Sequence, residues 1–195
     1  MNPQQQRAFI SCTLLFILYV ITITKLTYLF FTFLLFASII ECILCIPTYS
    51  VQTLYILLPT LLFVNVQICD EQDRSIYLLI LVYNSISDMI QYLGGRLLGK
   101  TKLFTFTEKT KEGYIAGITL TFAICDMVVP TGDTRFRNNY LLLNIAGMIG
   151  GIISSKCKRK LGIKHWSHLL GPHGGINDRL DSWMLPSLYF YLCIK

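Results

Sequence analysis

The chain has 195 residues, of which 53% are hydrophobic and only 14% are charged. A typical soluble domain carries roughly 25% charged residues, and a chain of this length has too small an interior to bury all the apolar runs present. These values argue against a soluble globular domain and favour an integral membrane protein. The formal net charge of +6 then indicates anionic headgroups or phosphates as partners, and not nucleic acid.

Seven apolar segments are long enough, or nearly long enough, to cross a bilayer as helices. Their predicted ranges are residues 9–23, 26–46, 51–68, 76–93, 113–129, 140–153 and 183–194. Pro47 and the charged cluster at residues 70–74 mark clear breaks, whereas only Lys25 and threonines separate the first two segments. We therefore predict an all-α fold, a polytopic transmembrane helix bundle of about seven spans, within a range of roughly six to eight.

Basic residues concentrate in two loops. Residues 94–112 and 154–181 together hold eleven of the 17 lysines and arginines. Two predicted spans separate these loops, so both lie on one face, and the positive-inside rule makes that face cytoplasmic. Arg135 and Arg137 fall in the loop on the opposite face, which conflicts mildly with this orientation. The membrane is predicted to be the bacterial inner membrane or the endoplasmic reticulum.

The first polar constellation begins at Asp88, near the end of an apolar span, and continues through Tyr92, two glycines and Arg96 to Lys100. A carboxylate within a span is costly, so Asp88 is expected to face a cavity or a cation. Glycines permit close backbone approach, and the basic side chains offer donors to phosphate. The alternative is an Asp88–Arg96 ion pair with a basic flank that only sets topology. The motif alone does not separate the two interpretations.

The second constellation is the run from Lys109 and Thr110 to Gly113. Lysine and threonine just before a helix can bind phosphate through their side chains and the helix N–H groups. This signal is weak alone because basic residues flank most spans.

The third constellation, residues 158–182, is the longest. Asp178 and Asp181 are three apart where a helix is predicted to begin, so they share one helix face. Two carboxylates at a membrane edge repel each other unless a cation lies between them, and Mg²⁺ prefers oxygen ligands. Arg179 can bind a phosphate bidentately, and His173 precedes a tight glycine turn. The alternative is a basic loop in which Asp178 only caps a helix. The other members are Lys158, Arg159, Lys160, Lys164, Gly174 and Gly175.

Several polar residues receive no functional role from the sequence. Glu41 and Asp126 are lone carboxylates in predicted spans, and each is interpreted either as lining a cavity or as lying near a span end. His165 and His168 lack ligand spacing and are interpreted as interfacial loop residues. The seven cysteines lie mostly in apolar runs and are interpreted as small buried hydrophobes.

In this order the three constellations resemble the phosphatidate cytidylyltransferase family. The resemblance covers roughly residues 84–186, and the third motif is long and specific. It implies N-terminal transmembrane helices over residues 1–83 and a cytidylyltransferase-like catalytic region over residues 84–195, within one integral membrane unit. The matching residues are Asp88, Tyr92, Gly95, Arg96, Lys109, Thr110, Glu112, Gly113, Ser155, Lys158, Arg159, Gly162, Lys164, His173, Gly174, Gly175, Asp178, Arg179 and Asp181.

The chain departs from the family's pattern at four places. Gly150-Gly151 stands where the family has Gly-Asp, and that aspartate is a metal ligand in the family. Lys164-His165 replaces Lys-Asp. Phe106-Thr107 replaces Ser-Pro, and Gly171-Pro172 inverts Pro-Gly. The first departure removes one carboxylate from the implied metal site.

The resemblance implies transfer of CMP from CTP to phosphatidate, giving CDP-diacylglycerol and pyrophosphate at the cytoplasmic bilayer edge. It implies Mg²⁺, with a monovalent cation as an addition, and it allows for a homodimer. The implied catalytic residues are Asp178, Asp181, Lys158 and Arg159, and the implied metal ligands are Asp178, Asp181 and Asp88. The implied substrate-binding residues are Asp88, Tyr92, Arg96, Lys109, Thr110, Lys164, His173, Gly174, Gly175 and Arg179.

Three alternatives stay open. A catalytically degenerate relative would keep the fold without the metal, as Gly151 and His165 suggest. A CTP-dependent polyprenol or phytol kinase is disfavoured by the complete run from His173 to Asp181. A transporter is disfavoured because paired Gly/Pro-broken spans are absent from the sequence.

Overall fold

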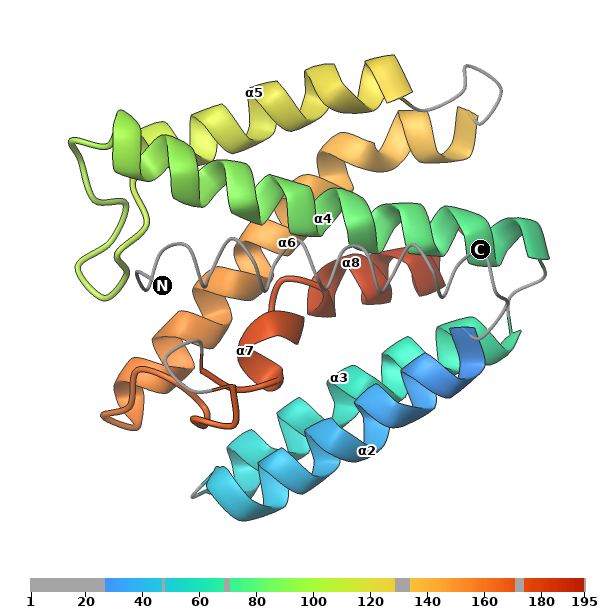
Figure 1. Ribbon diagram of the computed structural model, residues 1–195, viewed down its shortest axis with the longest axis vertical. Coiled ribbons are helices and arrows are strands. Elements are labelled where there is room, and N and C mark those ends of the chain that lie inside the picture. The colour runs from blue at the N-terminus through green and yellow to red at the C-terminus, as the bar shows by residue number, and fades with distance from the viewer. Residues whose placement is uncertain (1–26, 47, 69–70, 129–133, 171–173, 195) are drawn as a thin grey trace. The chain divides into compact units, whose positions relative to one another are not determined.

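The computed structural model describes residues 27–46, 48–68, 71–128, 134–170 and 174–194 (Figure 1). Within these ranges the chain is helical and forms no strand, which confirms the predicted all-α fold. The predicted first span, residues 9–23, lies outside them, as do Pro47 and His173. The described helices are α2 (Thr27–Cys45), α3 (Tyr49–Ile68), α4 (Glu71–Leu97), α5 (Lys111–Val128), α6 (Thr134–Lys160), α7 (Asn177–Leu180), α8 (Met184–Tyr189) and the π-helix η2 (Phe190–Ile194).

Two helices are longer than the sequence predicts. α4 and α6 each have 27 residues, whereas the apolar segments within them cover only residues 76–93 and 140–153. The additional turns are polar, and α6 ends in Lys158, Arg159 and Lys160. A prediction based on apolar residues stops at such polar residues, although the helical hydrogen bonds continue through them. Cations in the last turn also stabilise the helix through their interaction with its dipole.

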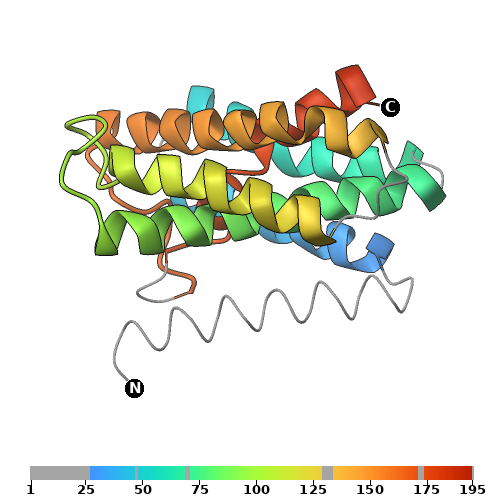
Figure 2. The same cartoon turned by 90° about the horizontal axis from the view of Figure 1, so that it is seen from above.

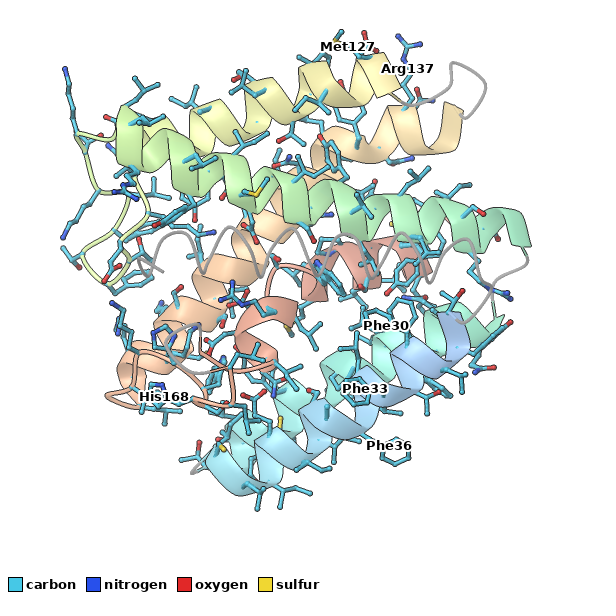
Figure 3. The ribbon with its side chains drawn as sticks, in the orientation of Figure 1. Phe30, Phe33, Phe36, Met127, Arg137 and His168 are labelled. Carbon is cyan, nitrogen blue, oxygen red and sulfur yellow. The ribbon has the colours of Figure 1, made fainter. Side chains whose placement is uncertain are left out.

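Four of the described helices are long and apolar enough to cross a membrane: Thr27–Cys45, Ser50–Gln67, Asp73–Leu97 and Arg137–Lys160. α5 carries Lys111, Glu112 and Asp126 in its 18 residues, and the α8–η2 segment is shorter. The total of about seven spans therefore stays a prediction. Phe33 and Phe36 on α2 are 66% and 60% exposed and project outward in Figure 3, as lipid-facing side chains do.

The chain divides into two compact units. The first contains α2, α3, the start of α4 up to Ser75, and His165–Leu180, which includes α7. Here α2 and α3 form a hairpin with Phe31 and Leu62 buried (Figure 1). The ring centroids of Tyr55 and Trp166 lie 4.3 Å apart, so the buried Trp166 ties the C-terminal loop to α3.

The second unit contains Ile76–Lys164 and Asp181–Lys195. One face of α4 is buried, and Tyr77 on it contacts the ring of Phe190 at 5.0 Å between centroids. The Tyr77 hydroxyl donates to Ser187 Oγ at 3.0 Å, and the Asn144 side chain donates to Ser87 Oγ at 2.9 Å. Such polar pairs hold helices together where lipid removes the hydrophobic driving force.

Glycines bring α4 and α5 into close contact at the end nearest the loop that joins them. A Cβ on Gly113 would lie 2.6 Å from the Gln91 carbonyl oxygen, and one on Gly94 would lie 2.8 Å from Ala116 Cβ. Both distances are too short for real side chains, so these glycines permit a backbone approach that other residues forbid. Figures 1 and 2 show the two helices side by side along this contact. The close contact fixes where the intervening loop places Lys109 and Thr110.

Candidate active site

A lysine from the α4–α5 loop is held by the α4 surface in the second unit. Lys109 Nζ donates to Asp88 Oδ1 at 3.1 Å and to Gln91 Oε1 at 3.4 Å. Asp88 and Gln91 are three residues apart and therefore lie on one face of the helix. The sequence placed Asp88 and Lys109 in separate motifs, and the structure joins them. Asp88 is thus paired with Lys109, which replaces the Asp88–Arg96 pair considered above.

The charge of Lys109 is fixed by its surroundings. Burial lowers the pKa of this amine, but the Asp88 carboxylate, followed by Tyr114 and Asp181, raises the pKa more, so the net shift is upward. The Lys109 side chain is 37% exposed, and its ammonium stays protonated at every physiological pH. Lys109 therefore acts as a permanent cation in this site.

A second lysine–aspartate pair lies at the end of α6. Lys158 Nζ lies 3.5 Å from Asp181 Oδ2, and the two side chains are only 10% and 15% exposed. A Cβ on Gly150 would lie 2.8 Å from the Asp181 carbonyl oxygen, so this glycine lets α6 pass close to the Asp181 backbone. Removing either charge would take a close counter-charge away from the other buried group, which is destabilising.

Gly151, on α6, lies close to the Asp88–Lys109 pair. A Cβ built on Gly151 would meet only Lys109 Nζ, at an ordinary contact distance of 3.6 Å. The position at which the resembling family has an aspartate therefore faces the Lys109 ammonium, and a Cβ there has room among the described residues. Together Asp88, Lys109, Lys158 and Asp181 form what we call the charge cluster, with two positive and two negative groups in the second unit.

The α4–α5 loop is a short hairpin that presents Lys109. Residues Lys102 and Thr110 form an antiparallel bridge, and Leu103 N donates to the Lys109 carbonyl at 3.1 Å. Glu112 closes the base by accepting hydrogen bonds from Thr101 N and, at 2.7 Å, from Thr101 Oγ1. These bonds hold the pKa of Glu112 at about 2, with the Thr101 hydroxyl as the largest cause.

Two predicted site residues, one catalytic and one substrate-binding, connect this hairpin to the segment at the end of α6. Arg159 Nε donates to the Phe106 carbonyl oxygen at 3.2 Å, and Lys164 Nζ donates to Glu108 Oε1 at 2.8 Å. The Lys164 hydrogen bond lowers the pKa of Glu108. Both links are exposed, so each contributes little to stability. Arg159 and Lys164 therefore contact the loop without stabilising it strongly, and Lys164 does so through its ammonium.

In the first unit, Asp178 binds backbone N–H groups of the segment between α6 and α7, which we call the glycine-rich loop. Its Oδ2 accepts hydrogen bonds from Trp166 N and Gly175 N, both at 2.9 Å, and lies 3.8 Å from His165 Nδ1. Gly174 has φ +82°, and a Cβ there would lie 2.6 Å from Asp178 Oδ2. The loop is therefore built around this carboxylate. The helix it starts, α7, ends at Leu180, so Asp181 lies just beyond it.

Glu41, which has no role assigned from the sequence, is buried on α2 and holds the same loop. Its Oε2 accepts the Asn177 N–H at 2.7 Å, and its Oε1 accepts the Ser167 hydroxyl. A Cβ on Gly175 would collide with Glu41 Oε1 where it now lies, so only glycine leaves the Glu41 carboxylate in this position. The signal that could have found this role is the cost of a carboxylate in an apolar span, which demands nearby donors.

The remaining predicted site residues take different positions. Thr110 Oγ1 accepts from Gly113 N at 3.2 Å at the start of α5. Tyr92 and Arg96 are exposed on α4, and Arg179 is exposed on α7. Gly174, Gly175, Asp178 and Arg179 belong to the first unit, and the charge cluster belongs to the second. The predicted single composite site therefore stays a prediction.

The carboxylates of the charge cluster can be compared with the ligands that the implied Mg²⁺ requires. Over the described ranges, no three His, Cys, Asp or Glu side chains gather into a metal-binding group. Asp88 and Asp181 are the two carboxylates that act on Lys109. Mg²⁺ commonly binds one or two carboxylates, keeps several waters and takes the rest of its ligands from substrate phosphates. Two carboxylates fit that mode of binding.

Comparison with known proteins gives consistent matches. Residues 3–195 match the profile of a family described as "Cytidylyltransferase family". The phosphatidate cytidylyltransferase of Aquifex aeolicus is 33% identical over 128 residues, which are 63% of this chain and 48% of that protein. The phosphatidate cytidylyltransferase of Staphylococcus haemolyticus is 38% identical over 121 residues, 55% of this chain and 45% of that protein.

A third relative, the "Uncharacterized protein YnbB" of Escherichia coli, is 30% identical over 125 residues, 60% of this chain and 42% of that protein. The chain thus spans about half the length of the curated relatives it matches.

Proposed function

Because this chain belongs to the cytidylyltransferase family, we propose that it transfers CMP from CTP to phosphatidate, giving CDP-diacylglycerol and pyrophosphate. The observation that carries the proposal is the charge cluster. Two lysines are each held by an aspartate, and the Lys158–Asp181 pair is buried, with side chains only 10% and 15% exposed. Both pairs lie within the residues that match the family profile. The substrates are thus CTP and phosphatidate at a bilayer surface.

The reaction requires positioning and charge neutralisation more than proton transfer. A phosphate oxygen of phosphatidate attacks the α-phosphorus of CTP, a new P–O bond forms, and the bond to the β-phosphate oxygen breaks, so pyrophosphate leaves with the bonding electron pair. The attacking oxygen is already anionic and needs no general base. Lys109 and Lys158 would stabilise the charge on the phosphoryl groups, because fixed cations act strongly in a site with little water.

Each lysine would exchange its carboxylate partner for a phosphate oxygen when the substrates bind. Asp88 and Asp181, released from Lys109 and Lys158, would then hold Mg²⁺, which supplies charge neutralisation on the triphosphate when bound. Asp178 is the third predicted ligand, but its Oδ2 already accepts two backbone hydrogen bonds, so its proposed role is to shape the glycine-rich loop. A monovalent cation and a homodimer are part of the same proposal.

The proposed topology is multi-pass, with the site on the cytoplasmic side of the membrane. The basic ends of α4 and α6 support it, since Arg96 and the run Lys158 to Lys160 occupy the last turns of two helices long enough to span. Cysteine accessibility in inverted and right-side-out vesicles would test the side. If an impermeant reagent labels a cysteine introduced at the exposed position of Lys160 in right-side-out vesicles but not in inverted ones, the proposed side is wrong.

The activity test uses purified protein in phospholipid–detergent micelles with labelled CTP, phosphatidate and Mg²⁺. We expect CDP-diacylglycerol and pyrophosphate to form, and Asp181→Asn and Lys158→Met to reduce the rate by about 10²-fold. Supplying polyprenol or phytol in place of phosphatidate separates the kinase alternative, because a kinase releases CDP and not pyrophosphate. Absence of lipid-linked CMP above the Asp181→Asn background would refute the transferase proposal.

The degenerate alternative rests on one observation, Gly151. Since, among the described residues, a Cβ at this position would meet only Lys109 Nζ, at 3.6 Å, Gly151→Asp would begin without a clash and would introduce a third carboxylate beside Lys109. If the natural chain is inactive and Gly151→Asp is active, the degenerate alternative is correct. If the natural chain is active, Gly151→Asp tests only whether a third carboxylate adds to metal affinity.

A further inference from the structure

Tyr114, in the first turn of α5, buries a hydroxyl group that the protein does not pair. Its side chain is 4% exposed, and within the described parts of the chain its hydroxyl has no hydrogen-bond partner. The residue cannot easily turn away, because Tyr114 N donates to the Thr110 carbonyl at 3.1 Å and Gly113 beside it packs on α4.

The phenol lies against the charge cluster. Lys109 Nζ is 5.4 Å from the centre of the Tyr114 ring, and the charges of Lys109, Asp88 and Asp181 all act on the hydroxyl. The ring face thus supports the ammonium through a cation–π contact. That contact needs only the ring, which phenylalanine would supply equally well. The hydroxyl is therefore the part of Tyr114 that the folded protein leaves unexplained.

A buried hydroxyl without a partner is unfavourable, because it gives up its hydrogen bonds to water. A partner that arrives from outside would remove this penalty. Beside a lysine that is always charged, the group best suited to accept a phenolic hydrogen bond is an anionic oxygen. A phosphoryl oxygen meets both requirements, since it accepts from the phenol and pairs with the ammonium.

We propose that the Tyr114 hydroxyl is a substrate-positioning donor, which binds a phosphoryl oxygen that Lys109 also contacts. This inference rests on the proposed function for the identity of the phosphoryl group. The phosphate monoester of phosphatidate and the triphosphate of CTP are two sources of the same chemistry. Tyr114 neither forms nor breaks a bond in the reaction.

The test compares Tyr114→Phe with Tyr189→Phe. The Tyr189 hydroxyl donates to Asn139 Oδ1 at 2.7 Å within the same unit, so it is a satisfied structural hydroxyl. The full chain is reconstituted in phosphatidylcholine nanodiscs. Thermal unfolding is then followed without ligand, with CTP, and with phosphatidate in place of part of the phosphatidylcholine.

Tyr114→Phe is expected to leave the unfolding temperature of the ligand-free protein unchanged or raised, and to weaken binding of one of the two ligands about tenfold. The ligand whose stabilisation falls identifies the source of the phosphoryl oxygen. Tyr189→Phe is expected to lower the ligand-free unfolding temperature and to leave both affinities as they were.

Two results would overturn the inference. One is unchanged binding of both CTP and phosphatidate by Tyr114→Phe. The other is a fall in ligand-free stability as large as that of Tyr189→Phe, which would show a structural partner for the hydroxyl. Because these measurements are of binding, they stand even where the natural chain makes no CDP-diacylglycerol. Where turnover occurs, KM for the identified substrate should rise about tenfold in Tyr114→Phe with kcat changed less.

Discussion

At the scale of single residues, four carboxylates of this chain hold neighbouring groups in place. Asp88 and Asp181 pair with lysines, Asp178 accepts backbone N–H groups, and Glu41 does the same from inside an apolar helix. An aspartate followed three residues later by another suits either a metal site or a helix cap, and sequence spacing cannot separate the two. The backbone bonds of Asp178 show that it at least shapes the loop, while its role toward a metal stays a prediction.

Glu41 gives a residue-scale prediction. Glu41→Ala would leave the Asn177 N–H and the Ser167 hydroxyl buried without their acceptor, at a cost of about 3 kcal/mol. Glu41→Gln keeps one acceptor oxygen and should lose roughly half as much. Thermal unfolding in detergent measures both, and limited proteolysis between residues 165 and 175 reports the loop. Equal stability of the alanine and glutamine variants would show that the hydrogen bonds of Glu41 do not hold the loop.

At the scale of helices, the apolar segments of the sequence predicted where α2 to α6 lie, but not which of them touch. The Asp88–Lys109 pair depends on the contact between α4 and α5 at Gly94 and Gly113. The apolar periodicity of the two helices does not predict that contact. Hairpin geometry then sets the position of Lys109. The sequence therefore named all four members of the charge cluster, while their pairing required the structure.

The glycine contact predicts a sharp difference between two alanine substitutions. In Gly113→Ala the new Cβ would lie 2.6 Å from the Gln91 carbonyl oxygen and 2.9 Å from Gly95 Cα, both backbone atoms, so α4 and α5 must separate. We expect a loss of about 2 kcal/mol in unfolding free energy and reduced activity. Gly151→Ala is the matched control, since its Cβ meets only a flexible lysine end. Equal behaviour of the two variants in thermal unfolding would contradict the close contact.

The base of the α4–α5 hairpin predicts a pH dependence. The pKa of Glu112 falls from 4.5 to about 2 in the folded chain, so its bonds to Thr101 stabilise the loop fully above pH 4.5 and are lost as pH falls toward 2. Glu112→Gln should therefore be less stable than the natural chain at pH 7, and the difference should shrink between pH 4.5 and pH 2. Chemical unfolding at pH 7, 4 and 3 measures this. A difference that is constant across that window would show that the carboxylate charge does not matter.

At the scale of the whole molecule, the sequence predicted the class better than the arrangement. Low charge content and long apolar runs predicted an all-α membrane protein, and the described helices agree. The division into two units was not predicted, because it follows from where residues 165–180 pack and not from any break in composition. Trp166 and Glu41 explain that packing, and both look like ordinary span or loop residues in the sequence.

The collision between a Gly175 side chain and Glu41 has a consequence for how such sequences can vary. Gly175 cannot gain even one methyl group while Glu41 keeps its carboxylate in place, and a shorter residue at position 41 would strand the donors of the loop. A side chain at position 175 therefore requires Glu41 to move, and moving Glu41 takes the acceptor from the Asn177 N–H. The two positions, 134 apart along the chain, are thus expected to show epistasis, because the cost of a side chain at 175 depends on the residue at 41.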